Sequence, residues 1–142
     1  MAYKTIYNPK NKSKYVGKLD NIICRSLWER RFCRYLDENQ KVLRWSSEEL
    51  AIPYVSPIDN KIHRYYPDFL IEVINKDGNV KTLLIEVKPL KQTKEPSYSN
   101  KKTQLKEMLR YKINLAKWNS AEKYCTKQEW EFKILTEKQL LI

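Results

Sequence analysis

Apolar residues recur along the chain at two different spacings, which predict helices in some segments and strands in others. Within residues 21–38, Trp28, Phe32, Tyr35 and Leu36 occupy positions i, i+4, i+7 and i+8, so they share one face of a helix. The arginines of the segment lie largely off that face. The pattern therefore predicts an amphipathic helix with one apolar side.

The other apolar segments are shorter, and turn-forming residues separate them. Pro57 and Asp59-Asn60 close one segment, Asn75 to Asn79 form a strong turn signal, and Pro89 ends another segment. Strands are predicted at 42–45, 49–55, 64–74, 80–88 and 130–135, a long basic helix at 100–124, and the start of a short helix at 136–139. This order predicts an α/β fold in which helices flank a mixed central sheet.

The length and composition of the chain are those of one folded domain. With 142 residues, of which 42% are hydrophobic, the chain can bury a substantial core, so we expect a single domain over residues 1–142. Residues 1–20 are polar and are predicted to form a basic N-terminal arm. No apolar run approaches the roughly 20 residues that a membrane span requires, so no contact with a membrane is expected.

The cysteine and histidine content argues against a zinc site and against disulfides. The chain has three cysteines, no Cys-x-x-Cys motif and one histidine, His63. Cys24 and Cys33 both fall within the predicted helix 21–38, where a spacing of nine positions places them on opposite faces. We therefore expect reduced thiols in a cytoplasm.

The net charge of +11 is unevenly distributed along the chain. Residues 1–34 carry +7, residues 35–87 carry −3, residues 88–112 carry +6 and residues 113–142 carry +1. Clustered lysines and arginines attract a polyanion such as DNA, although a basic surface that only keeps the protein solvated would have the same composition. The residues expected to contact DNA are Lys10, Lys12, Lys14, Arg25, Arg30, Arg31, Lys91, Lys94, Lys101, Lys102 and Lys112.

The N-terminal arm has two interpretations. Its lysines at positions 10, 12 and 14 are interleaved with Tyr3, Tyr7 and Tyr15. Lysines contact phosphates and tyrosines stack on bases, which would make the segment a DNA-contacting arm. The same residues are equally compatible with an ordinary extended segment that leads into the domain.

Two short strings place acidic and basic side chains on neighbouring predicted strands. Pro67-Asp68 lies in the strand 64–74, and Glu86-Val87-Lys88 ends the strand 80–88. If the numbers of paired residues in this hairpin sum to 154, Asp68 faces Glu86, and their Cβ atoms are about 5 Å apart on one face of the sheet. Lys88 shares that face, because it lies two residues beyond Glu86.

The turn between the two strands decides this register. A three-residue loop at 76–78 pairs Asn75 with Asn79 and produces the sum of 154. A two-residue loop would make the sum 155 and would separate Asp68 from Glu86. Gly78 favours the longer loop, whose last position takes a left-handed backbone conformation.

Two carboxylates and a lysine in this arrangement fit the chemistry of phosphodiester hydrolysis. Mg²⁺ prefers carboxylate ligands and retains several waters, so it can activate a water and stabilise charge on the phosphate. A nearby lysine can orient or help to deprotonate the attacking water and can stabilise the transition state. The strings therefore indicate a nuclease.

Each candidate also has a purely structural explanation. Cross-strand acidic and basic residues are common as surface charges, and Glu131-Phe132-Lys133 repeats the Glu-x-Lys pattern without a Pro-Asp partner, so we interpret that copy as structural. Glu29 follows Ser26 by three positions, which is the spacing of a capping box, but it also borders the apolar stripe and could be a third acidic ligand.

Lys112 is unusual because it falls next to an apolar face of the predicted helix 100–124. It lies about 20° outside the sector of Leu105, Leu109 and Ala116. Its side chain either extends to solvent or points into the active site. Gln104 and Tyr111 are weaker candidates on the same helix, and His63 is interpreted as a surface or DNA-facing residue.

Together these residues resemble the PD-(D/E)xK nuclease superfamily. Within it, four stretches are similar to phage head-completion nucleases and to the endonuclease subunit of heteromeric cut-and-paste transposases. These stretches are Arg25–Phe32, Tyr66–Phe69, Leu84–Pro89 and Trp130–Glu137. The similarity runs from about Arg25 to Leu140, and the small size of the chain fits the phage family better.

The resemblance implies a restriction-endonuclease-like core and a Mg²⁺-dependent DNA endonuclease, with Mn²⁺ as a possible substitute, that processes packaged phage DNA or completes heads. It implies that Asp68 and Glu86 bind the metal, that Glu29 supports them and that Lys88 is the catalytic lysine. DNA and phage head or portal proteins would be the partners, in the host cytoplasm and the virion. Two alternatives stay open: a non-catalytic DNA-binding virion protein, and a transposase-like or repair nuclease that acts with partner proteins.

Overall fold

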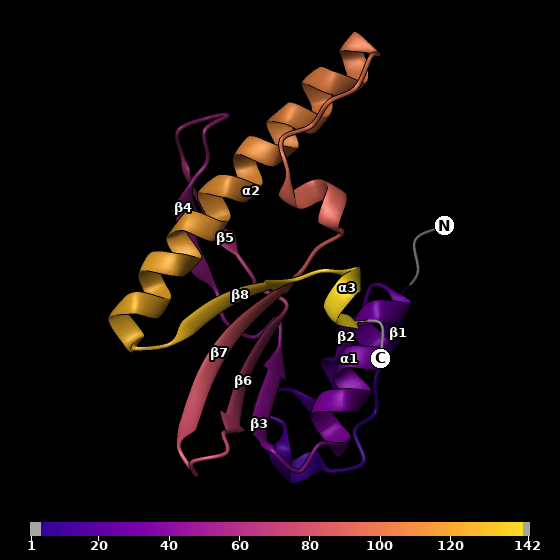
Figure 1. Ribbon diagram of the computed structural model, residues 1–142, viewed down its shortest axis with the longest axis vertical. Coiled ribbons are helices and arrows are strands. Elements are labelled where there is room, and N and C mark those ends of the chain that lie inside the picture. Colours follow the sequence, from indigo (N-terminus) through magenta and orange to yellow (C-terminus); the bar gives the residue numbers. More distant parts are fainter. Residues whose placement is uncertain (1–3, 141–142) are drawn as a thin grey trace.

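The computed structural model describes residues 4–140 and is built around a four-stranded mixed sheet (Figure 1). The strands β3 (Val42–Ser47), β6 (Phe69–Ile74) and β7 (Val80–Val87) are antiparallel neighbours, and β8 (Glu131–Leu135) joins β7 in parallel. A parallel neighbour requires a crossover connection, and the long helix α2 (Lys101–Gln128) provides it. The predicted α/β fold with a mixed sheet and flanking helices is confirmed and has the restriction-endonuclease-like arrangement.

The two faces of the sheet are covered by different helices, because side chains alternate between the faces of each strand. On one face, Phe69 and Ile85 pack with residues of α1 (Leu27–Glu38). On the other face, Leu84 packs with the C-terminal half of α2, where Trp118 and Ala121 are buried. The apolar stripe of the first predicted helix is confirmed in part: Phe32 and Leu36 are buried and Trp28 packs against the core, but Tyr35 is exposed.

Smaller elements surround this core. The short strands β1 (Thr5–Ile6) and β2 (Ile23–Cys24) pair with each other, as do β4 (Ile52–Val55) and β5 (Ile62–Tyr65). The remaining elements are the 3₁₀ turns η1 (Lys12–Lys14), η2 (Leu19–Asn21) and η3 (Leu90–Thr93) and the final helix α3 (Glu137–Leu140). The β4–β5 hairpin and α2 both extend beyond the end of the sheet (Figure 1).

The register of the β6–β7 hairpin is the predicted one. Phe69 pairs with Ile85 and Ile74 pairs with Val80, so the numbers of paired residues sum to 154. The amide of Asn75 donates to the carbonyl of Asn79 at 2.9 Å, which closes a three-residue loop. Gly78 has φ 82°, the left-handed conformation that the last loop position requires.

Several predicted boundaries are wrong, including the end of the long helix, which lies at Gln128 and not at residue 124. The helix predicted from residue 21 begins at Leu27, because Ser26 accepts a hydrogen bond from the Glu29 amide at 3.1 Å and thereby caps the helix. The strand predicted at 49–55 begins at Ile52. The strand predicted at 64–74 is interrupted around Pro67, so its first part pairs with β4 and its second part with β3 and β7.

The prediction for Cys24 and Cys33 is also wrong. Cys24 lies in β2 and not in the helix, and its Sγ is 3.5 Å from the Sγ of Cys33 in α1. Both thiols are buried and free. The error arose from the helix boundary, because the opposite-face argument applies only when both residues belong to one helix.

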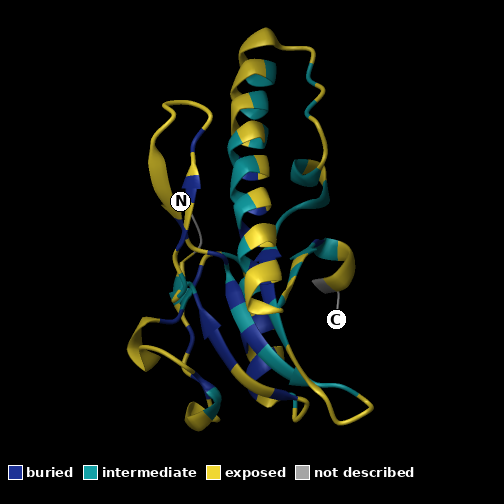
Figure 2. Cartoon of the chain, turned by 90° about the vertical axis from the view of Figure 1, so that its left-hand side faces the viewer, coloured by how far each residue is buried: buried dark blue, intermediate teal, exposed yellow. Residues whose placement is uncertain are grey.

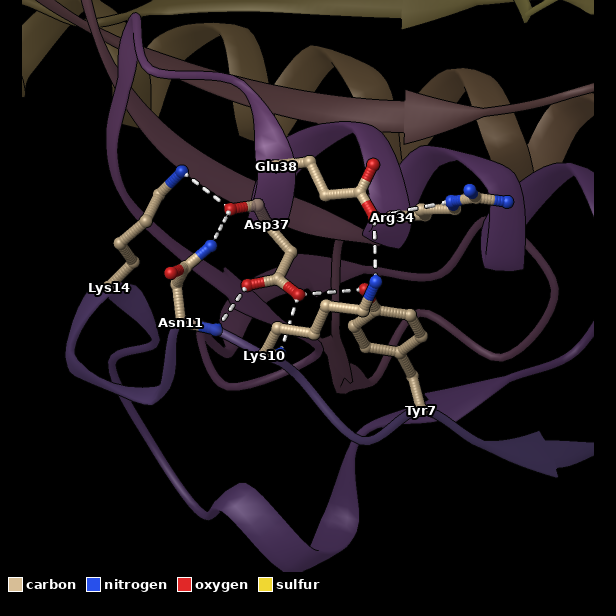
Figure 3. Close-up of polar contacts among 7 residues, drawn as sticks. All are labelled: Tyr7, Lys10, Asn11, Lys14, Arg34, Asp37 and Glu38. Carbon is tan, nitrogen blue, oxygen red and sulfur yellow. Dashed lines mark hydrogen bonds and ion pairs between the residues drawn. The ribbon is translucent and has the colours of Figure 1, made fainter.

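The N-terminal segment is held against α1 by Asp37, a carboxylate with no exposed surface (Figure 3). Its Oδ2 accepts hydrogen bonds from the Tyr7 hydroxyl at 2.8 Å and from the Lys10 amide at 2.7 Å. Its Oδ1 accepts from the Asn11 amide at 3.0 Å. Burial alone would raise the pKa of Asp37, but these hydrogen bonds lower the pKa below its usual value.

Lys14 adds a second attachment of the same segment. Its ammonium group donates to three carbonyl oxygens at the C-terminal end of α1, where a cation is favoured by the helix dipole. The acceptors are Leu36, Asp37 and Asn39, at 2.8, 2.9 and 2.9 Å. The described part of the predicted arm, from residue 4, is therefore folded into the domain, and its first three residues lie outside the described residues.

Helix α2 is divided into a packed half and an exposed half. All of its buried residues lie between Asn114 and Cys125, whereas Leu105 and Leu109 near its start are exposed. The exposed half stands clear of the sheet (Figure 2). Within residues 4–140, no helix combines the length and the apolar character needed to cross a membrane.

Candidate active site

The acidic residues predicted to act together meet at the end of the sheet where β6 begins and β7 ends. Asp68 directly precedes β6, and the register places it opposite Glu86. The Asp68 Oδ2 accepts a hydrogen bond from the Val87 amide at 2.7 Å, which fixes the carboxylate against β7. Glu86 is buried, and its Oε2 lies 3.8 Å from the Nζ of Lys88. The hairpin therefore gathers Asp68, Glu86 and Lys88.

Glu29 reaches this group from the first turn of α1. Its amide donates to the Ser26 Oγ, and its own Oε2 accepts from that hydroxyl at 3.4 Å. The carboxylate also has an oxygen within 4.8 Å of an oxygen of Asp68. Ser26 thus caps the helix while Glu29 contributes to the acidic group, so the two interpretations of the Ser26–Glu29 spacing are compatible.

Glu48 is a further acid at the site that sequence reasoning missed. Carboxylate oxygens of Glu29, Glu48 and Asp68 all lie within 4.8 Å of one another. Glu48 follows β3 with φ 53°, and its amide donates to the Asp68 carbonyl at 3.1 Å. Its carboxylate is paired with the Arg25 guanidinium, with Nε and Nη2 at 3.0 and 3.2 Å. The available signal was an acidic pair, Glu48-Glu49, directly after a strand.

The carboxylates of this group disfavour one another's charge. Burial raises the pKa of Asp68 well above its usual value, and the neighbouring Glu86 raises it further. Burial and the nearby Glu48 likewise raise the pKa of Glu29. The pKa of Tyr65 is raised by burial and by the charge of Glu86. The site therefore holds more negative charge than its own lysine and arginine compensate, and it favours a proton or a cation.

The donor set fits a hard divalent cation. Carboxylate oxygens are the ligands that Mg²⁺ prefers, and two oxygens bound to one Mg²⁺ at about 2.1 Å can be at most about 4.2 Å apart. The oxygens of Glu29, Glu48 and Asp68 lie within 4.8 Å of one another, so a small side-chain rotation would bring them to that separation. Glu86 stands next to Asp68 and could supply a further oxygen.

A lysine of α2 approaches this site, but it is Lys117 and not Lys112. Lys112 is exposed, which agrees with the first of its two interpretations. Lys117 is partly buried, and burial lowers its pKa, as does the positive charge of Lys88. Glu86 and Asp68 act on Lys117 in the opposite direction. Sequence reasoning missed Lys117 because its position depends on where α2 crosses the sheet.

The predicted DNA contacts of the N-terminal half are placed in different surroundings. Lys12 is exposed, Lys10 forms an exposed ion pair with Glu38 at 3.6 Å, and the Lys14 ammonium is occupied by the end of α1. Tyr7 and Tyr15 are buried, where they contact Trp45 edge-on, so neither is free to stack on bases. Arg25 is paired with Glu48, while Arg30 and Arg31 are exposed on α1.

The predicted contacts that follow β7 lie around α2. Lys91 and Lys94 line a cavity of about 240 Å³ between the segment 91–98 and α2, and the Lys91 Nζ lies 4.6 Å from the ring centroid of Tyr98. Lys101 and Lys102 are exposed at the start of α2. Gln104 is engaged by the loop, since it accepts from the Tyr98 amide at 2.7 Å. His63 is an exposed residue paired with Asp59 at 2.8 Å.

Comparisons with known proteins agree with this geometry. The family model described as TnsA-like endonuclease N terminal matches residues 39–137, which include Asp68, Glu86 and Lys88. The Head completion nuclease of Enterobacteria phage T4 is 36% identical over 146 residues, and the aligned region covers 99% of this chain and 95% of that relative. No solved structure matches the chain significantly.

Proposed function

We propose that this chain hydrolyses DNA phosphodiester bonds with Mg²⁺ held by its acidic group. The chain belongs to the TnsA-like N-terminal endonuclease family and is a nuclease. The observation that supports this most directly is the register of the β6–β7 hairpin, which puts Asp68 opposite Glu86 with Lys88 on the same side. A solvated surface charge pattern would not require a buried Glu86 or a raised pKa for Asp68.

Each side chain has a separate role in this proposal. Asp68 and Glu86 bind the metal, with Glu29 and Glu48 as further oxygen donors. When bound, the metal supplies Lewis-acid stabilisation of charge on the phosphate and lowers the pKa of a coordinated water. Lys88, which is 3.8 Å from Glu86, orients the attacking water and stabilises negative charge in the transition state.

The exposed basic residues on both sides of the site hold the DNA backbone. Arg30 and Arg31 lie on α1, whose first turn carries Glu29, and Lys101, Lys102 and Lys112 lie on α2. We leave Lys14 out of this surface because its ammonium group already donates to three carbonyls. Such phosphate contacts make binding salt-dependent and carry no sequence information.

The similarity to a phage head completion nuclease supports a role at that stage of phage assembly. We propose that the chain acts on phage DNA during packaging or head completion, in the host cytoplasm and in association with the virion. Phage head or portal proteins are the proposed partners. A pull-down from infected cells would recover those proteins, whereas recovery of recombination proteins alone would favour the transposase-like alternative.

A cleavage assay with a matched pair of variants tests the site. Wild-type protein should cleave DNA with Mg²⁺ and not with chelator, and Glu86→Ala should abolish cleavage. Glu131→Ala is the control, because Glu131-Phe132-Lys133 repeats the Glu-x-Lys string on β8 with its charged side chains in exposed ion pairs. Undiminished cleavage by Glu86→Ala, or no cleavage under any metal condition, would contradict the proposal.

A further inference from the structure

Lys117 lies on the packed half of α2, directly before the buried Trp118. Its side chain is partly buried and crosses the rings of two tyrosines from the β4–β5 hairpin. The Nζ lies 5.6 Å from the ring centroid of Tyr65 and 5.9 Å from that of Tyr54. Tyr65 packs in one buried cluster with Leu84, which lies two residues before Glu86 on the same face of β7, and it precedes Asp68 by three residues. The Lys117 ammonium is thereby positioned next to the acidic site, on the side of α2.

The charges around Lys117 do not account for an ammonium at this position. Among residues 4–140, Lys117 forms no ion pair with a carboxylate within 4.0 Å, and the positive charge of Lys88 disfavours its own. The carboxylates of Glu86 and Asp68 attract Lys117, but Glu86 is already paired with Lys88 at 3.8 Å. A partly desolvated cation beside a second cation is unfavourable unless an anion joins them.

Packing does not account for the ammonium either. An apolar side chain of similar length, such as methionine, would cover the two tyrosine rings without the cost of desolvating a charge. Both ring distances are longer than the 4.6 Å between Lys91 and Tyr98, so the cation–π attraction of Lys117 to each ring is weaker than that of Lys91 to Tyr98. Two lysines whose positive charges act on each other beside the acidic group instead match a phosphate, which can accept hydrogen bonds from both.

We propose that Lys117 is a second phosphate-binding lysine of the active site, which holds a DNA phosphate together with Lys88. This inference rests on the proposed function for the choice of ligand. The acidic group binds the metal, Lys88 approaches the phosphate from β7, and Lys117 approaches it from α2. Helix α2 then contributes directly to substrate binding at the site, in addition to its exposed basic residues farther along.

The test compares Lys117→Met, Lys117→Arg and the control Lys123→Met. Lys123 is exposed and lies on the same helix, six positions later and about 240° around its axis from Lys117. Single-turnover cleavage by Lys117→Met should fall about 100-fold. Lys117→Arg should stay within about 10-fold of wild type because it retains the charge. Lys123→Met should cleave like wild type.

A binding measurement separates this inference from the proposed function. Binding to a DNA duplex is measured in chelator, in a Glu86→Gln background, as the slope of log affinity against log salt concentration. For Lys117→Met the magnitude of this slope should decrease by about 0.9, which corresponds to the loss of one phosphate contact. It should not change for Lys123→Met. Because this slope needs no cleavage, an inactive wild-type protein with the expected slopes would refute the proposed function and leave the phosphate contact standing.

Thermal unfolding shows whether Lys117 is merely structural. Removing a partly buried charge should leave the unfolding midpoint of Lys117→Met unchanged or higher. An unchanged salt slope together with wild-type cleavage overturns the inference. So does a loss of activity that only follows a loss of folded protein in both Lys117→Met and a second variant, Lys117→Gln.

Discussion

Asp37 and Asp68 are two aspartates that the fold removes from solvent to a large extent, yet their surroundings differ in kind. Asp37 accepts hydrogen bonds from one hydroxyl and two amides, and its pKa is lowered (Figure 3). Asp68 accepts one hydrogen bond from the Val87 amide and faces Glu86 and Glu29, and its pKa is raised. The first carboxylate is satisfied by the chain, and the second requires something that the chain does not supply.

The comparison teaches how to tell a structural acid from a functional one. Burial acts in the same direction at both positions, since desolvation alone raises the pKa of either carboxylate. The difference lies in the number of donors and the sign of the neighbouring charges. The fold stabilises the charge of Asp37 with N–H and O–H donors. It surrounds Asp68 with other carboxylates, and a bound cation would stabilise that group.

The largest expected effect is on cleavage by Asp68→Asn. The amide side chain can still accept the hydrogen bond from Val87, but it removes a proposed ligand, so cleavage with Mg²⁺ should fall about 1000-fold. The unfolding midpoint in chelator should be unchanged or higher, because a repulsive charge has been removed. Single-turnover kinetics and thermal unfolding measure the two effects. A strongly destabilised variant would place Asp68 in the same structural class as Asp37.

The reverse pattern is expected for Asp37→Ala. The substitution leaves the Tyr7 hydroxyl and the amides of Lys10 and Asn11 without an acceptor, so the free energy of unfolding should fall by about 3 to 5 kcal/mol. Cleavage per folded molecule should remain close to that of wild type, because the carboxylate is not at the acidic site. Urea unfolding and activity at low temperature measure these quantities. A stability loss below about 1 kcal/mol would show that Asp37 is not the attachment point of the N-terminal segment.

A smaller effect is expected for Glu48→Gln, which tests the acid that the sequence did not reveal. The variant keeps the shape of the side chain and removes one charge from the group of Glu29, Glu48 and Asp68. The Mg²⁺ concentration for half-maximal cleavage should rise about 10-fold, with a smaller change in the rate at saturating metal. Metal titration of the cleavage rate measures both. An unchanged titration would restrict Glu48 to its ion pair with Arg25.

The smallest effects are opposite pH dependences of stability. Because the pKa of Asp68 is raised, the folded chain keeps a proton on this carboxyl at pH values where the unfolded chain has released it. In chelator, the contribution of Asp68 to the free energy of unfolding therefore falls as pH rises above about 4. Because the pKa of Asp37 is lowered, its contribution to the free energy of unfolding is present above about pH 4 and is lost as pH falls below that value. Unfolding curves of Asp68→Asn and Asp37→Asn across pH, each subtracted from wild type, should have slopes of opposite sign, and equal slopes would contradict the comparison. Saturating Mg²⁺ should remove the Asp68 slope at neutral pH.

The parts of the site that the sequence predicted are those that depend on local geometry. The turn around Gly78 determined the register, and the register determined which side chains face each other, so Asp68 and Glu86 could be paired by counting. Glu29 was proposed from its position beside the apolar stripe of the helix, and the resemblance to the nuclease family, which included it, is confirmed by the family to which the chain belongs. Whether these residues bind a metal stays a prediction.

The parts that the sequence did not predict depend on contacts between distant segments. Glu48 joins the acidic group because its own left-handed backbone conformation turns the chain after β3. The approach of Lys117 to the group depends on the position at which α2 crosses the sheet. The proximity of Cys24 to Cys33 was missed because β2 pairs with β1 before the helix begins. Spacing along one element cannot reveal such approaches, since they result from the packing of several elements.

The loop of Lys76, Asp77 and Gly78 has a consequence for how this protein can change over generations. It lies about 20 Å along β7 from Glu86, in an exposed turn of the kind where insertions and deletions usually do little harm. Here the loss or gain of one residue would shift β7 by one position and turn Glu86 and Lys88 to the opposite face. Viable changes in the length of this turn should therefore come in steps of two residues or with a compensating bulge. The length of the turn is thus constrained by the candidate active site, although the two are not in contact.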